Sequence, residues 1–308
     1  VHQVARQSDA NLACGTFVIP TVIEINAIRE IGREVFGPVL HFVRYKRENL
    51  DRLLADIAQT GYGLTLGLHT RIDETIAQVV DSAHVGNLYV NRNMVGAVVG
   101  VQPFGGEGLS GTGPKAGGPL YLYRLLSARP DDVLVGGIRQ DGEIRDAAFL
   151  PARPVAMNAL IQWAKAQDVS LSECCARYAQ QTWSHDAVDL VGPTGERNVY
   201  RLTARQRVLC LANNDADRLV QLAAVLAVGG GVIWTGEGEA LLRRLPAEVQ
   251  SCVVISPDWT HPNTLFDAVL LHGTEDELRQ LQTTLAGREG AVISVERLSP
   301  GETAIPLE

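Results

Sequence analysis

The sequence predicts an α/β protein built from two consecutive units, each with strands and helices in alternation. At 308 residues, 46% hydrophobic and 20% charged, the chain is long enough to bury two cores. Strand-like apolar runs alternate with stretches of helical spacing along most of its length. A polar stretch over 128–146 interrupts this pattern and is taken as the boundary region. The repeated strand-helix-strand order implies right-handed crossovers and largely parallel sheets.

The first unit is predicted to alternate strand and helix between residues 16 and 91. Expected strands cover 16–19, 39–45, 64–68 and 87–91, and expected helices cover 49–59 and 73–84. Leu50, Leu53, Leu54 and Ile57 have the i, i+3, i+4, i+7 spacing of one helical face. Nine glycines between Gly96 and Gly118 predict a shaped loop. The apolar run 120–126 is expected to be an edge strand covered by a partner.

The second unit repeats the rhythm and is predicted to be an open, doubly wound domain. Expected helices cover 156–167, 171–181, 215–228 and 275–285, and expected strands cover 208–211, 232–234, 252–255, 268–271 and 291–295. The helix over 171–181 is expected to be capped by Ser170 or Ser172. The three glycines at 229–231 follow a helix and precede a strand, which favours a helix C-cap over a phosphate site.

Composition excludes several classes of function. A net charge of -8 and a pI near 5.4 argue against binding of nucleic acid by this segment. Apolar runs are too short to cross a bilayer, so no transmembrane segment is expected. Five cysteines do not form a disulfide framework, and scattered histidines predict no metal site. The cytoplasm is the expected location, and a start at Val1 suggests a piece of a longer polypeptide.

Two segments carry candidate chemistry. In Glu34-Val35-Phe36-Gly37-Pro38-Val39, a carboxylate can accept hydrogen bonds from both hydroxyls of a ribose, and an aromatic ring can pack beside nicotinamide. Taken alone, the segment reads as a helix end followed by a strand. Gly106-x-Gly108-x-x-Gly111 imitates a dinucleotide fingerprint, but prolines flank it where a strand and a helix are required. Its glycines could instead present backbone N–H groups to a carboxylate.

Taken together, 34–39, Pro103-Phe104-Gly105-Gly106 and Ser110-Gly111-Thr112-Gly113 resemble the aldehyde dehydrogenase superfamily in order and spacing. The resemblance implies that Glu34 and Phe36 hold the nicotinamide ribose of NAD and that the Phe104 loop borders the aldehyde tunnel. It also implies a cysteine nucleophile in a Gly-Gln-x-Cys setting well upstream. No such motif precedes Cys14, so no catalytic residue is assigned to this chain, and the isolated chain is expected to be inactive.

The stretch from Gly86-Asn87-Leu88-Tyr89 through Gly117-Gly118-Pro119-Leu120 resembles the glutamate semialdehyde dehydrogenase module of the proline utilization A family. This implies that Ser110 and Gly111 anchor the substrate carboxylate and that Phe104 packs on its aliphatic part. NAD would be the cofactor, with FAD only in the separate proline dehydrogenase part. The resemblance also implies a homo-oligomer in which this chain joins the rest of the polypeptide.

The resemblance further implies a division of the chain. Residues 1–130 would be the C-terminal half of an aldehyde dehydrogenase module, 131–150 a linker, and 151–308 a helical lead-in with a noncatalytic Rossmann-like domain. Two alternatives stay open: a noncatalytic interaction or oligomerisation module, and an aldehyde dehydrogenase of other specificity. The sequence leaves open NAD against NADP and the oligomer size.

Overall fold

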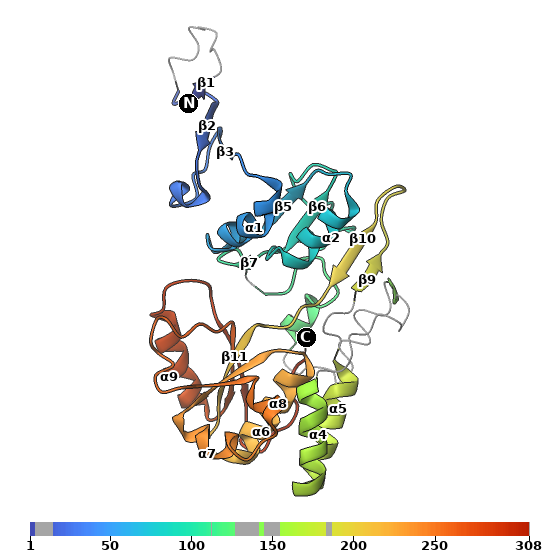
Figure 1. Cartoon of the computed structure of the whole chain (residues 1–308), viewed down its shortest axis with the longest axis vertical. Helices are drawn as coiled ribbons and strands as arrows, with labels where there is room; N and C mark the ends of the chain where they lie inside the picture. Colours follow the sequence, from blue (N-terminus) through green and yellow to red (C-terminus); the bar gives the residue numbers. More distant parts are fainter. Residues whose placement is uncertain (4–14, 112, 127–141, 145–154, 183–186, 308) are drawn as a thin grey trace. The chain divides into compact units, whose positions relative to one another are not determined.

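The computed structural model describes residues 1–3, 15–111, 113–126, 142–144, 155–182 and 187–307 (Figure 1). Two compact units are present. The first unit comprises Val1–Gly96 and Gly105–Gly113, and the second comprises Ala97–Phe104 and Pro114–Glu308. The predicted linker 131–150 lies outside the described residues, apart from 142–144.

The first unit consists of short parallel βαβ pieces. Its elements are β1 (His2–Gln3), β2 (Thr21–Ile25), η2 (Ile28–Ile31), β3 (Val39–Val43), η3 (Arg47–Asn49), α1 (Leu50–Ala58), β4 (Tyr62–Gly63), β5 (Thr65–Leu68), α2 (Asp73–Ser82), β6 (Asn87–Val90) and β7 (Glu107–Gly108). β2 and β3 pair in parallel, as do β5 and β6. β1 pairs antiparallel with β2, and β7 pairs antiparallel with β4. Leu50 and Leu54 of α1 pack with Val79 of α2, which confirms the predicted buried face of α1. The parallel pairings are confirmed, although they lie in separate small sheets.

Two strand predictions in this part of the sequence are wrong. Residues 16–19 form no strand; the strand begins at Thr21, whose N–H donates to the carbonyl of Pro38 and starts the register with β3. The run 120–126 is no edge strand, because Leu122–Leu125 form a 3₁₀ turn, η4. Its apolar residues nevertheless pack: Leu120 and Tyr123 contact Val188, Leu202 and Leu307 of the second unit.

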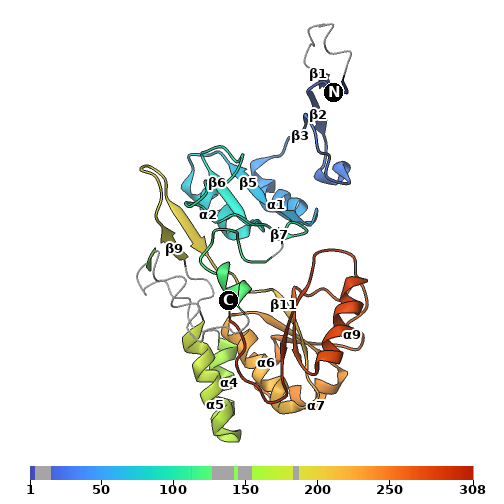
Figure 2. The same ribbon diagram turned by 180° about the vertical axis from the view of Figure 1, so that it is seen from behind.

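The second unit is an open parallel sheet with a helical pair and a hairpin (Figure 2). Besides η4, its elements are β8 (Gly142–Ile144), α4 (Val155–Gln167), α5 (Val169–Gln181), β9 (Ala187–Leu190), β10 (Asn198–Arg201), β11 (Arg207–Leu211), α6 (Asp215–Ala227), β12 (Gly231–Thr235), η6 (Gly236–Gly238), α7 (Glu239–Leu242), α8 (Ala247–Gln250), β13 (Val253–Ser256), β14 (Ala268–His272), α9 (Glu275–Ala286) and β15 (Ser294–Leu298). The sheet has the order β13-β12-β11-β14-β15, and all its pairs are parallel. Antiparallel β10-β9-β8 form a separate sheet.

Side chains alternate between the two faces of this parallel sheet. Val208, Cys210, Val232 and Trp234 pack against α4 to α8 on one face. Leu209, Ile233, Val269 and Leu271 pack against α9 on the other face. Helices therefore cover both faces. The order reverses between β11 and β14, since α6 leads to β12 on one side while α9 leads from β14 to β15 on the other.

Local hydrogen bonds cap the helices of this unit. The glycines after α6 form the predicted C-cap: the Gly229 N–H donates to Leu226 O and the Gly230 N–H to Val225 O, the paired bonds of a Schellman motif. The cap of α5 is Asp168, which accepts from the Ser170 N–H at 2.8 Å, and the expectation of Ser170 or Ser172 is wrong. β15 begins at 294 because its register with β14 pairs Ser294 with Ala268. The sequence did not predict β9 and β10.

Candidate functional site

The Ser110 hydroxyl lies within the glycine-rich loop and is hydrogen-bonded to a residue of β4. Its Oγ accepts a hydrogen bond from the Gly63 N–H at 3.3 Å, and the side chain is partly buried. The Ser110 N–H donates to the Glu107 carbonyl at 3.0 Å. Because Oγ is the acceptor in the bond with Gly63, its own hydrogen can still be donated to an anion. Ser110 therefore presents a partly buried hydroxyl that still has a hydrogen to donate.

Close packing of the backbone sets the shape of this loop. An ideal Cβ on Gly106 would lie 2.6 Å from Ser110 Cβ, and Gly108 has a φ of +60°. A Cβ on Gly86 would run into the Gly105 carbonyl. Beside it, Asn87 Oδ1 accepts the Gly105 N–H at 3.2 Å. Gly86 and Asn87, at the start of β6, thus fix the position of the loop. No spacing in the sequence predicted this role.

Gly111 is held by the same tight packing. Its N–H donates to the Gly108 carbonyl at 3.0 Å, and its ideal Cβ would meet Gly106 O at 3.1 Å. A ligand carboxylate would have to share the Gly111 N–H with the Gly108 carbonyl or replace that carbonyl as its acceptor. The Ser110 hydroxyl is the donor that needs no such rearrangement.

Phe104 belongs to the second unit. It forms a bridge with Ala116, in which the Phe104 N–H donates at 3.0 Å and its carbonyl accepts at 2.9 Å. Two residues before it, the Gln102 amide donates to Glu196 Oε2 and to Asn198 Oδ1, both at 3.2 Å. The turn between β9 and β10 therefore holds the segment that leads to Phe104.

Glu34 and Phe36 lie in the irregular segment between η2 and β3. Both side chains are exposed, Phe36 by 96%. Gly37 follows with a φ of +148°, a value that favours glycine. A shallow hollow of about 350 Å³ lies next to this segment, lined by residues 20–22 and 37–40. The segment presents a carboxylate and an aromatic ring on the surface of the first unit.

Two of the described cysteines, Cys175 and Cys210, are poor nucleophiles. Burial raises the pKa of the Cys175 thiol to about 12, with Cys174 adding to the shift, and burial raises the pKa of Cys210 as well. A thiol with a raised pKa stays protonated at neutral pH and attacks carbonyls slowly. Cys14 lies outside the described residues. Within the described ranges, no cluster of His, Cys, Asp or Glu has the makings of a metal site.

Among the described residues, no helix combines the length and apolar character that spanning a bilayer demands.

Comparison with known proteins identifies the family. The profile "Aldehyde dehydrogenase family" matches residues 2–129. The bifunctional protein PutA of Klebsiella aerogenes is 55% identical over 315 residues, covering 100% of this chain and 24% of that protein. The 1-pyrroline-5-carboxylate dehydrogenase of Bacillus cereus (strain B4264) is 44% identical over 117 residues, which cover 37% of this chain and 22% of that protein.

A solved structure shares the fold. Proline utilization A (PutA) from Corynebacterium freiburgense aligns with a TM-score of 0.54 and 20% identity, covering 85% of this chain and 23% of that chain. The chain spans about a quarter of the length of the PutA proteins that it matches. The predicted resemblance to this family is confirmed. Residues 2–129 belong to the aldehyde dehydrogenase family, and the chain is similar along its length to one part of the PutA proteins.

Proposed function

We propose that this chain supplies the substrate-anchoring loop of an NAD-dependent L-glutamate γ-semialdehyde (1-pyrroline-5-carboxylate) dehydrogenase that forms glutamate in proline catabolism. The observation that carries the proposal is the Ser110 hydroxyl, oriented by the Gly63 N–H at 3.3 Å. This substrate carries a carboxylate, and an oriented hydroxyl with a hydrogen to donate suits such an anion. The similarity to PutA and to 1-pyrroline-5-carboxylate dehydrogenases supports the same substrate.

The residues of this chain bind and orient in that reaction. Ser110, with Gly111, holds the substrate carboxylate, and Phe104 packs on the aliphatic carbons. Glu34 accepts hydrogen bonds from the nicotinamide ribose and Phe36 packs beside the ring, on an exposed segment that suits a ligand. Enzymes of the aldehyde dehydrogenase family generally use NAD(P), and the cofactor takes up the hydride. The thiol nucleophile comes from another part of the polypeptide.

The second unit is proposed to be a noncatalytic Rossmann-like domain. Its all-parallel sheet, with helices on both faces, supports the fold assignment, and the raised thiol pKa values of Cys175 and Cys210 fit the absence of catalysis. The division into 1–130, 131–150 and 151–308 stays a prediction. The parent protein is proposed to be cytoplasmic and at least dimeric; Leu122 and Leu125, 71% and 73% exposed, offer apolar surface for a partner.

Ser110→Ala in the whole polypeptide tests the proposal. A hydrogen bond to a charged group contributes about 1.5–3 kcal/mol, so kcat/KM for glutamate semialdehyde should fall roughly tenfold to hundredfold. The KM for NAD and the turnover of an uncharged aliphatic aldehyde should stay near wild type. Ser294→Ala, at an exposed serine of β15, is the matched control. An equal loss with the uncharged aldehyde would show that Ser110 shapes the loop and does not bind the carboxylate.

The isolated chain is expected to oxidise no aldehyde. NADH formation from glutamate semialdehyde above a control without protein would contradict this expectation and move the nucleophile into this chain.

A further inference from the structure

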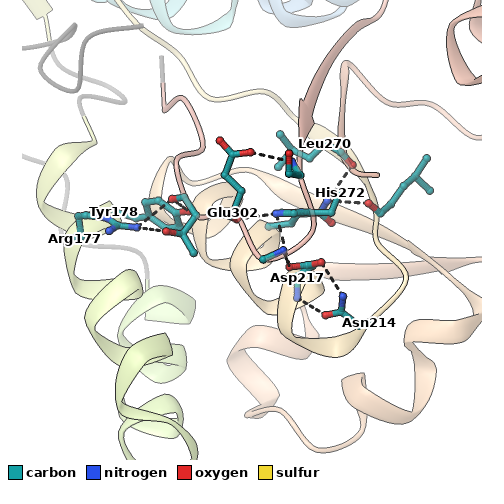
Figure 3. A network of polar contacts seen from close by, with 12 residues as sticks. Arg177, Tyr178, Asn214, Asp217, Leu270, His272 and Glu302 are labelled. Atoms are coloured by element: carbon teal, nitrogen blue, oxygen red, sulfur yellow. Dashed lines mark hydrogen bonds and ion pairs between the residues drawn. The ribbon is translucent and has the colours of Figure 1, made fainter. Parts of the chain in front are cut away.

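Residues 299–307, which follow β15, cross the end of the parallel sheet and are called the strap. Three consecutive strap residues are held by side chains from three different elements (Figure 3). The Gly301 N–H donates to Asp217 Oδ1 at 2.9 Å, and the carbonyl of Glu302 lies 2.8 Å from His272 Nε2. The Thr303 carbonyl accepts from the Tyr178 hydroxyl at 2.7 Å.

The side chains that hold the strap are themselves buried and fixed. Asp217 is 3% exposed, His272 1% and Tyr178 1%. Asp217 Oδ2 accepts from Asn214 Nδ2 at 2.7 Å, so both carboxylate oxygens are satisfied. Because a carbonyl can only accept, the His272 ring carries its proton on Nε2 and donates it to Glu302 O. Buried polar groups with directed partners form a built site for the backbone of the strap.

The position of this site in the fold is specific. Asp217 lies in the first turn of α6, directly after β11, and His272 is the last residue of β14. β11 and β14 are the adjacent strands at which the sheet order reverses. In open parallel sheets, the crevice outside the carboxyl ends of these two strands is where ligands bind. The strap therefore lies where a ligand would enter.

The neighbouring loop is unsuited to a dinucleotide. Residues 212–216, which run from the end of β11 into the first turn of α6, read Ala-Asn-Asn-Asp-Ala and contain no glycine. Asn214 already caps α6 by accepting the Asp217 N–H at 2.9 Å. A pyrophosphate there would also meet the carboxylates of Asp215 and Asp217. Close backbone approach and a free helix N-terminus, both of which a dinucleotide needs, are missing from this loop.

The strap also ties the helical pair to the sheet. Arg177 on α5 donates to the Thr303 carbonyl and to Thr303 Oγ1, both at 3.0 Å. Beyond these bonds, Ile305 is 7% exposed within the core that contains α4, α5 and α6. The polar bonds at 301–303 and the apolar anchor at 305 fix the same segment from both sides.

We propose that the strap is a permanent intramolecular occupant of the crevice between β11 and β14, and that Asp217 and His272 are its positioning residues. The strap takes the place of a ligand and locks α5 onto the sheet. The carboxyl ends of β11 and β14 thus bind a segment of the same chain.

Hydrogen exchange in the 308-residue chain, resolved to peptides over 299–305 and over α5, tests the proposal. His272→Ala removes the donor to Glu302, and exchange in both peptides should accelerate about tenfold. His272→Gln places an amide donor near the position of Nε2 and should restore protection. His261→Ala, at an exposed histidine in the loop after β13, is the control and should match wild type.

Three outcomes would overturn the proposal. One is wild-type exchange in His272→Ala. Another is equal acceleration in His272→Gln and His272→Ala, because the lost group would then not be the Nε2 donor. The third uses wild-type protein with millimolar NADH: faster exchange over 299–305 would show that a dinucleotide displaces the strap. Unchanged exchange in NADH supports permanent occupancy.

Discussion

Asn87 holds the main chain of Gly105, eighteen residues further along the sequence: its Oδ1 accepts the Gly105 N–H at 3.2 Å. Asn87 is the first residue of β6 and is 9% exposed. Its neighbour Gly86 lies against the Gly105 carbonyl with no room for a side chain. The strand thus fixes the base of the loop that carries Ser110, and the chemistry proposed for Ser110 depends on this contact.

Gly86→Ala should disturb the position of the loop that carries Ser110 without removing a group that binds substrate. The added methyl group must displace the Gly105 backbone, and overpacking of this kind costs about 1–3 kcal/mol. We expect a lower free energy of unfolding of the first unit in denaturant and, in the whole polypeptide, a higher KM for the semialdehyde. Gly96→Ala is the matched control, since nothing lies within 4 Å of its added Cβ. Equal effects of the two substitutions would contradict the proposed role of the close packing between Gly86 and Gly105.

Gln102→Ala should release the segment that leads to Phe104 from the β9–β10 turn. The Gln102 amide nitrogen donates to Glu196 and Asn198, and its oxygen accepts the Val98 N–H at 3.0 Å. Hydrogen exchange over 97–104 should accelerate, while Gln282→Ala on the exposed face of α9 should leave it unchanged.

Gln102→Glu sharpens this prediction. A carboxylate at 102 faces Glu196 and should accelerate exchange further at pH 7. Acid weakens the repulsion between two carboxylates, so the two variants should converge as the pH is lowered to 4. A Gln102→Glu protein that exchanges like wild type at pH 7 would contradict the contact.

Local physics explains which parts of the fold could be predicted. Leu50 and Leu54 marked the buried face of α1, and the glycines at 229–231 marked the cap of α6, because both signals depend on neighbours in the sequence. The prediction of a strand at 120–126 was wrong, because a short apolar run does not distinguish a strand from a buried turn. η4 is set by contacts with Val188 and Leu307, which are far away in the sequence.

The same limit applies to the candidate site. Ser110, Gly111, Phe104, Glu34 and Phe36 could be named because family motifs carry them. The residues that position the loop could not. The bond from Asn87 to Gly105 spans eighteen residues and the bond from Gly63 to Ser110 spans forty-seven, without any repeated spacing. Such long-range hydrogen bonds exist only after the chain has folded.

Ionised Glu277 should raise the free energy of unfolding of the second unit at neutral pH. Hydrogen bonds from the Thr274 N–H and hydroxyl, and from Asn213, lower the pKa of this carboxyl. A carboxyl whose pKa is lower in the folded state contributes stability above its unfolded pKa, and this contribution is lost as the pH falls through the folded pKa. Glu277→Gln should therefore lower the free energy of unfolding at pH 7, and the difference from wild type should shrink toward pH 3.

Urea unfolding at both pH values, followed by the fluorescence of buried Trp234, measures this difference. Glu289→Gln, at an exposed carboxylate after α9, is the control. A difference between Glu277→Gln and wild type that is the same at pH 3 and pH 7 would assign the effect to packing and not to charge.

Alkylation of the native chain should distinguish its thiols. Cys252 is partly exposed, and its Sγ lies 3.5 Å from the Glu248 carbonyl near the surface of α8. Cys175 and Cys210 are buried, and burial raises the pKa of both. Only the thiolate reacts with iodoacetamide, so at pH 7.5 Cys252 should be labelled well before the two buried thiols.

Mass spectrometry of tryptic peptides over time gives the rate at each of these positions. Labelling of Cys175 and Cys210 requires opening of the core that they share with α4, α5 and α6, so both should follow the unfolding rate and accelerate together in mild urea. Cys252→Ser is the control and should leave these two rates unchanged. Labelling of Cys175 as fast as that of Cys252 in the absence of urea would contradict the packing of α5 in this core.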